Sequence, residues 1–149
     1  LGKTIASDQG AIKLQGSRDG KGFQWTEGKQ LLFYPSHTEN TRAWIQSEFS
    51  VDAEGLRQLT LRASKADDYG IYRILLDDVV LRDRYDFYSQ NLEITEINLG
   101  QYKLQVGAHL IRFECLGKSD SSKGFNLGFD SIRLRERFEV KRTTPTDLY

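Results

Sequence analysis

The chain has 149 residues, with 21 basic and 21 acidic side chains and a formal net charge of zero. This length suits one domain with a single hydrophobic core. The neutral balance excludes the strongly basic surface of a nucleic-acid binding domain, and no apolar run approaches the roughly 18 residues of a membrane span. We therefore expect a globular module that binds neither nucleic acid nor a membrane.

The sequence contains no methionine and one cysteine, Cys115. Without a methionine, residue 1 is not a translation start, and the chain is interpreted as a mature product or an excised domain. A single cysteine excludes an intrachain disulfide and a cysteine-based zinc site.

Apolar and polar residues alternate with a period of two in several short segments, which is the pattern of half-buried β-strands. In the segment that ends at Val51, for example, Ile45, Phe49 and Val51 share one face. In chain order, the expected strands are Ala11–Gln15, Gln30–Tyr34, Ala43–Val51, Gln58–Ala63, Ile71–Leu76, Val79–Leu81, Ile94–Leu99, His109–Cys115 and Ser131–Leu134.

Turn-forming residues separate these segments, and no stretch has a convincing helical periodicity. The turn signals are Asp52–Gly55, Asp77–Asp78, Gly100, Val106–Gly107 and Gly117–Gly124. The one helix-permissive segment is Arg82–Gln90. Closely spaced short strands predict an all-β fold, an antiparallel β-sandwich or jelly roll. We expect one module over residues 1–140, followed by a C-terminal tail over residues 141–149.

No group of residues in the sequence specifies catalysis. His37 and His109 have no partner at metal-ligand spacing, and we expect His109 to be structural. The adjacent acids Asp77-Asp78 are interpreted as a tight turn, because aspartate side chains bond their own backbone in turns. Asp67-Asp68 precede Tyr69 in a loop that could face a ligand. We predict that the chain is not an enzyme, with a hydrolase acting through Asp67 or Asp68 as the least favoured alternative.

Aromatic residues make up 11% of the chain, and several lie near the expected loops. Sugars offer apolar C–H faces that stack on aromatic rings and hydroxyls that bond to charged side chains. Trp44 lies on the polar face of its strand, as either a packing residue or a stacking platform. The candidate ligand-binding residues are Trp25, Arg42, Trp44, Asp67, Asp68, Tyr69, Lys118, Asp120 and Phe125.

A succession of short motifs runs through the second half of the chain. Its parts are Asp67-Asp68-Tyr69-Gly70, Asn98-Leu99-Gly100, Gly107-Ala108-His109, Gly117-Lys118-Ser119 and Gly128-Phe129-Asp130. Over about residues 10–136, the sequence resembles the galactose-binding-like β-sandwich modules of bacterial carbohydrate-active proteins. These include carbohydrate-binding modules and the C-terminal modules of a jelly-roll glycoside hydrolase family.

This resemblance implies a non-catalytic carbohydrate-binding module of a secreted bacterial protein. Its partners would be a carbohydrate and a catalytic domain of the same parent chain, in an extracellular or periplasmic location. The alternative is a structural or oligomerisation module, in which the same aromatic residues anchor a protein interface.

Related modules often hold a structural calcium ion with acids of the first strand and an aspartate of the last strand. Asp130 matches the last-strand position, but Lys13 and Gln15 stand where the first-strand acids would be. Calcium requires six to eight oxygen ligands with sufficient negative charge. We therefore expect no metal and no other cofactor.

Overall fold

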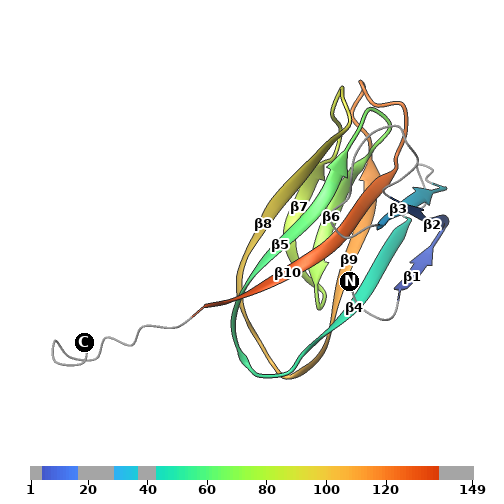
Figure 1. The fold of residues 1–149 in the computed structure, drawn as a ribbon. Helices are drawn as coiled ribbons and strands as arrows, with labels where there is room; N and C mark the ends of the chain where they lie inside the picture. The colour runs from blue at the N-terminus through green and yellow to red at the C-terminus, as the bar shows by residue number, and fades with distance from the viewer. Residues whose placement is uncertain (1–4, 17–28, 37–42, 138–149) are drawn as a thin grey trace, which may run out of the picture.

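The computed structural model describes residues 5–16, 29–36 and 43–137, which form ten β-strands and no helix (Figure 1). None of the described elements is a helix able to span a membrane. The strands are β1 (Ile5–Asp8), β2 (Gly10–Gly16), β3 (Lys29–Pro35), β4 (Trp44–Val51), β5 (Gly55–Lys65), β6 (Ile71–Leu76), β7 (Val79–Asp86), β8 (Glu93–Leu104), β9 (Gly107–Gly117) and β10 (Leu127–Arg137).

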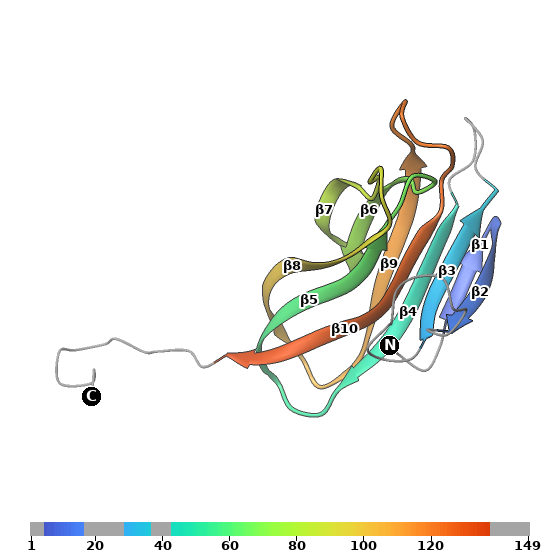
Figure 2. The same cartoon turned by 45° about the horizontal axis from the view of Figure 1, so that its top comes forward.

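The strands form two five-stranded sheets that pack face to face (Figures 1 and 2). The strand order is β1-β4-β9-β6-β7 in the first sheet and β2-β3-β10-β5-β8 in the second. Every pair of neighbouring strands is antiparallel. The prediction of an all-β antiparallel sandwich is confirmed.

The core lies between the two sheets and is formed by the inward residues of the alternating pattern. In β5, Leu59 and Leu61 are fully buried, as the alternation predicts. Phe113 of β9 and Phe129 of β10 come from opposite sheets, and their ring centroids lie 4.7 Å apart. This aromatic contact joins the central strands of the two sheets.

Each of the nine expected strands overlaps an observed strand. The helix-permissive segment Arg82–Gln90 contains the second half of β7 rather than a helix, because pairing with β6 outweighs local propensity. The boundary expected at residue 140 lies outside the described residues.

The turn expected at Gly100 is instead an irregularity inside β8. The pairing register with β5 shifts between Leu59 and Thr60, opposite this glycine, which has a φ of +106°. The backbone N–H of Gly100 donates to Asn98 Oδ1 at 2.9 Å. The register shift and the positive φ identify a β-bulge at Gly100. Glycine is needed there because a Cβ atom would approach the Tyr102 hydroxyl to 2.8 Å.

The connections between strands gather at the two ends of the sandwich (Figure 1). The segments 66–70, 87–92 and 118–126 join strands at one end, which we call the loop end. The tighter connections 52–54, 77–78 and 105–106 lie at the other end, which we call the hairpin end.

Candidate functional site

At the loop end, backbone hydrogen bonds lock the segment 66–70 to the segment 118–126. Lys123 N donates to Asp67 O at 2.8 Å, and Asn126 N donates to Asp68 O at 3.0 Å. In the opposite direction, Gly70 N donates to Asn126 O at 3.0 Å. The two loops therefore form one hydrogen-bonded unit. Because the loops are already ordered, binding a ligand costs less conformational entropy of the protein.

The buried hydroxyl of Ser122 lies at the centre of this unit. Its Oγ atom is 2.7 Å from Tyr69 O, 2.9 Å from Gly124 O and 3.2 Å from Asp67 O. One hydroxyl proton serves these three acceptors, and the shortest contact joins the two loops. The Ser122 hydroxyl therefore holds the segments 66–70 and 118–126 together from the buried side of the unit.

Charged side chains cover the outside of the unit. Asp67 and Lys123 form an ion pair at 3.0 Å, and both side chains are exposed. The hydrogen bond to Asp67, followed by the charge of Asp67, raises the pKa of Lys123. Lys118 and Asp120 are exposed on the same loop. Asp68 is less available, because its Oδ2 atom accepts a bond from Asn126 Nδ2 at 3.2 Å.

The aromatic residues predicted for this loop end are less accessible than the charged ones. Tyr69 is only 5% exposed, and its hydroxyl lies 2.7 Å from Ser64 Oγ. This burial corrects the choice of Tyr69 as a ligand-binding residue, because a ring that is buried in the protein offers no face to a sugar. Phe125 is half-buried and packs against the core, and its carbonyl accepts a bond from the Tyr72 hydroxyl.

Tyr88 is an aromatic residue of the loop end that sequence reasoning left out of the candidate set. It forms an isolated bridge with Ala66, is half-buried and lies close enough to Lys123 to help raise the pKa of that amine. Phe87 beside it is fully buried. Tyr88 could have been identified from the alternation of residues that continues after β7. If Phe87 points into the core, its neighbour Tyr88 points towards the surface.

Trp44 lies at the start of β4 in the first sheet, not in the loop unit itself. It is half-buried and pairs in register with Glu114 of β9. The guanidinium carbon of Arg112 lies 4.1 Å from the Trp44 ring centroid, which is a cation–π contact. One face of the ring is thus covered by Arg112. Trp25 and Arg42, the remaining candidates, lie outside the described residues.

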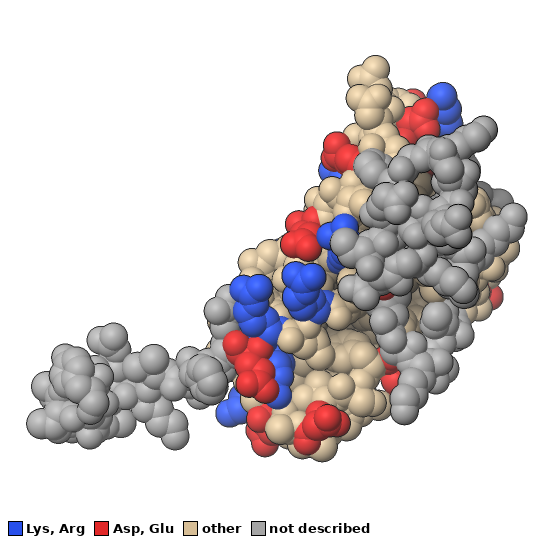
Figure 3. Space-filling view, viewed as in Figure 1, with Lys and Arg blue, Asp and Glu red and all other residues tan. Residues whose placement is uncertain are grey.

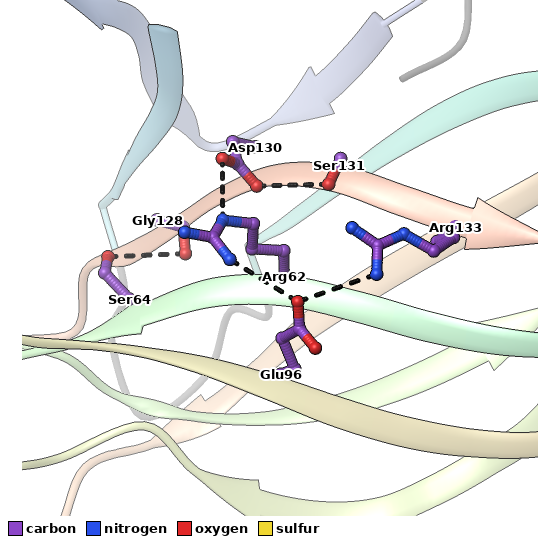
Figure 4. A network of polar contacts seen from close by, with 7 residues as sticks. All are labelled: Arg62, Ser64, Glu96, Gly128, Asp130, Ser131 and Arg133. Atoms are coloured by element: carbon purple, nitrogen blue, oxygen red, sulfur yellow. Dashed lines mark hydrogen bonds and ion pairs between the residues drawn. The ribbon is translucent and has the colours of Figure 1, made fainter. Parts of the chain in front are cut away.

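Asp130 belongs to a chain of charges that crosses three strands of the second sheet (Figure 4). Its side chain is 0% exposed, and its Oδ2 atom lies 3.4 Å from Arg62 Nε. Arg62 also pairs with Glu96 at 3.4 Å, and Glu96 lies 3.8 Å from Arg133. The Ser131 hydroxyl donates to Asp130 Oδ1 at 3.2 Å. A guanidinium thus lies beside the buried carboxylate that the resemblance associates with calcium.

At the hairpin end, Asp77 and Asp78 form the two-residue turn predicted between β6 and β7. Their φ values of 48° and 68° are typical of a type I′ hairpin. Asp77 also binds β9, because its Oδ1 atom accepts a bond from Leu110 N at 2.8 Å. Its Oδ2 atom lies 2.6 Å from His109 Nδ1. His109 is buried and has the structural role predicted for it.

Both ring nitrogens of His109 face acceptors, because Nε2 lies 2.7 Å from Gln105 O. Burial lowers the pKa of His109, but the hydrogen bonds to Asp77 and Gln105 and the charge of Asp77 outweigh it and raise the pKa overall. An imidazolium donates both bonds at once, whereas a neutral ring donates only one.

The His109–Asp77 pair therefore makes stability depend on pH. A raised folded-state pKa adds stability below the ordinary pKa of histidine, and this is lost as the pH rises through the folded-state value. We expect thermal unfolding near pH 6 to occur at a higher temperature than near pH 8. The Asp77→Asn variant keeps a turn-forming side chain but removes the charge, so this part of the pH dependence should disappear. An unchanged pH profile in Asp77→Asn would contradict the role of the pair.

The face of the molecule in Figure 3 carries lysine and arginine interspersed with aspartate and glutamate. On this face, the described residues show no large patch of one sign. This distribution agrees with the zero net charge of the chain.

No known family profile matches the sequence, and no curated protein matches it. Solved structures do match the fold. Xanthan lyase from Paenibacillus aligns with a TM-score of 0.70 and 20% identity, over 90% of this chain and 12% of that one. A family 35 carbohydrate-binding module from Clostridium thermocellum aligns with a TM-score of 0.55 and 15% identity, over 89% of this chain and 92% of the module.

A third similar structure is the β-(1,4)-mannanase of Podospora anserina, which carries a family 35 module. It aligns with a TM-score of 0.52 and 16% identity, over 93% of this chain and 29% of the mannanase. The chain thus spans only a small part of the two enzymes and nearly the whole of the isolated module. It shares the β-sandwich fold of this family 35 module.

Proposed function

We propose that this chain is a non-catalytic carbohydrate-binding module and that its loop end contacts the sugar. The observation that carries the proposal is the locked loop unit with Asp67, Lys123, Lys118 and Asp120 exposed on it. Charged groups fixed on a rigid surface bond to sugar hydroxyls with little ordering cost. The fold similarity to an isolated family 35 module supports this function.

Within this proposal, Tyr88 supplies the apolar contact in place of Tyr69. Tyr88 is half-buried, bridges to Ala66 and lies close to Lys123, whereas Tyr69 is buried. A C–H face of a sugar stacks on such a ring while hydroxyls bond to the adjacent acid and amine. Trp44 and Arg112 then form a separate surface on the first sheet, outside this contact set.

We further propose that the module belongs to a secreted bacterial protein with a catalytic domain and that Asp130 needs no calcium. Similar folds occur within two larger enzymes, which supports an enzyme as the parent protein. The described residues contain no cluster of three or more His, Cys, Asp or Glu suited to a metal. Arg62 already supplies positive charge at Asp130, where a second cation would be repelled.

The test of this function is a glycan-array screen with the full chain, followed by calorimetric titration of the oligosaccharide that binds best. We expect the Asp67→Asn and Tyr88→Ala variants to weaken binding by about tenfold each, through loss of a charged hydrogen bond and of stacking. Tyr69→Phe keeps the buried ring and should retain affinity if the folded loop is preserved.

The matched control is Asp52→Asn, the same substitution at an exposed aspartate of the hairpin end. It should leave the affinity unchanged. A blank array would reject the carbohydrate-binding function in favour of a structural module. Equal losses in Asp52→Asn and Asp67→Asn would reject the loop end as the site.

A further inference from the structure

A cavity of about 240 Å³ opens at the hairpin end, between the edge strands of the two sheets. From the first sheet it is lined by Leu76, Val79 and Leu81, and from the second sheet by Tyr102 and Leu104. The pocket lies at the opposite end of the sandwich from the proposed sugar contacts.

Three polar side chains in the wall of this cavity, those of Tyr102, His109 and Asp77, are already bonded to the protein. The Tyr102 hydroxyl donates to Leu99 O at 2.6 Å. Both nitrogens of His109 and both carboxylate oxygens of Asp77 also have protein partners. A sugar placed here would bury hydroxyls beside groups that are already paired, which is unfavourable. The chemistry of the wall therefore fits an apolar group.

Exposed apolar side chains surround the opening. Val79 is 62% exposed at its wall, and Val106 is 63% exposed beside Gln105, another lining residue. Val80 and Leu110 are also exposed on the adjoining strands β7 and β9. A protruding apolar group and an apolar hollow thus lie on one surface. A protruding group beside a hollow is the arrangement that two copies related by a two-fold axis need in order to fill each other's hollow.

The charges and the strand edge at this opening are also compatible with a second copy. Asp78 at the hairpin tip and Lys103 in the wall are both exposed and have no ion pair among the described residues. β7 is an edge strand, and its charges begin at Arg82, so Val79 and Val80 lack the charged protection typical of exposed edges.

We propose that the hairpin end binds a second copy of this chain. In the dimer, Val79 and Val106 of each copy cover the cavity of the other, and Lys103 faces Asp78 across the axis. The patch is small, so we expect a reversible dimer of the weak class that buries less than about 1,200 Å². This inference goes beyond the proposed function and does not depend on it.

The test is sedimentation equilibrium of the full chain, from about 10 μM to about 1 mM, the range in which weak complexes associate. We expect concentration-dependent dimers for the wild type. The Val106→Glu variant should weaken association at least about tenfold, because it places a charge in an apolar contact. Lys103→Glu should weaken it as well, since it would face Asp78 of the other copy.

The matched control is Leu92→Glu, which replaces an apolar residue 47% exposed at the loop end. This variant should dimerise like the wild type, and thermal unfolding of all three variants verifies that they fold. A wild type that stays monomeric at the highest concentration would overturn the proposal. Dissociation by Leu92→Glu, with Val106→Glu unaffected, would overturn it too.

Discussion

Replacing Phe113 with alanine should lower the free energy of unfolding by about 3–5 kcal/mol. Phe113 is fully buried and stacks on Phe129 of the opposite sheet, with ring centroids 4.7 Å apart. Alanine removes the ring and leaves a cavity between central strands that cannot close without moving both sheets. In a chain of this length, the loss corresponds to a fall of about 10 °C in the unfolding temperature.

Two controls separate this effect from a general weakness of β9. Phe113→Leu retains most of the volume and should cost about 1 kcal/mol. Leu110→Ala changes an exposed residue of the same strand and should shift stability by less than about 0.5 kcal/mol. Urea unfolding followed by fluorescence provides the measurement. Equal losses for Phe113→Ala and Leu110→Ala would show that the ring contact does not dominate.

The elements of this fold could be predicted from local patterns, but their pairing could not. Alternation alone places Leu59 and Leu61 in the core, where both are fully buried. The same signal does not indicate that β3 pairs with β10, a partner about a hundred residues away in the chain. Strand order is decided by packing between distant segments, and periodicity carries no information about it.

The candidate site shows the same division. The Asp77-Asp78 turn was predictable, because it depends on the chemistry of two adjacent residues. The burial of Tyr69 was not predictable, because it depends on Ser64 and on a loop more than fifty residues further along. Turn signals in the sequence place Asp67, Lys118 and Asp120 in loops. They do not indicate that Lys123 pairs with Asp67, because that contact joins two distant loops.

The second large effect is expected at Arg62. The Arg62→Gln variant should lose about 3–5 kcal/mol of stability, because it removes the guanidinium that lies 3.4 Å from the buried carboxylate of Asp130. Asp130→Asn should cost less, since it removes the buried charge itself and leaves an oxygen that can accept the Ser131 hydroxyl. The double variant should therefore be more stable than Arg62→Gln alone.

Calcium distinguishes this ion pair from a metal site. If Arg62 neutralises Asp130, neither added calcium nor a chelator should move the unfolding midpoint of the wild type. A midpoint that falls with chelator would mean that a metal, rather than Arg62, holds Asp130 in the wild type. In Arg62→Gln the guanidinium is gone, so partial restoration of stability by calcium there would mean that the guanidinium occupies a position a metal can fill. In both the wild type and the variant, the buried Asp130 of the last strand would then bind a cation. Residue 62 would determine whether that cation is a guanidinium or a metal ion.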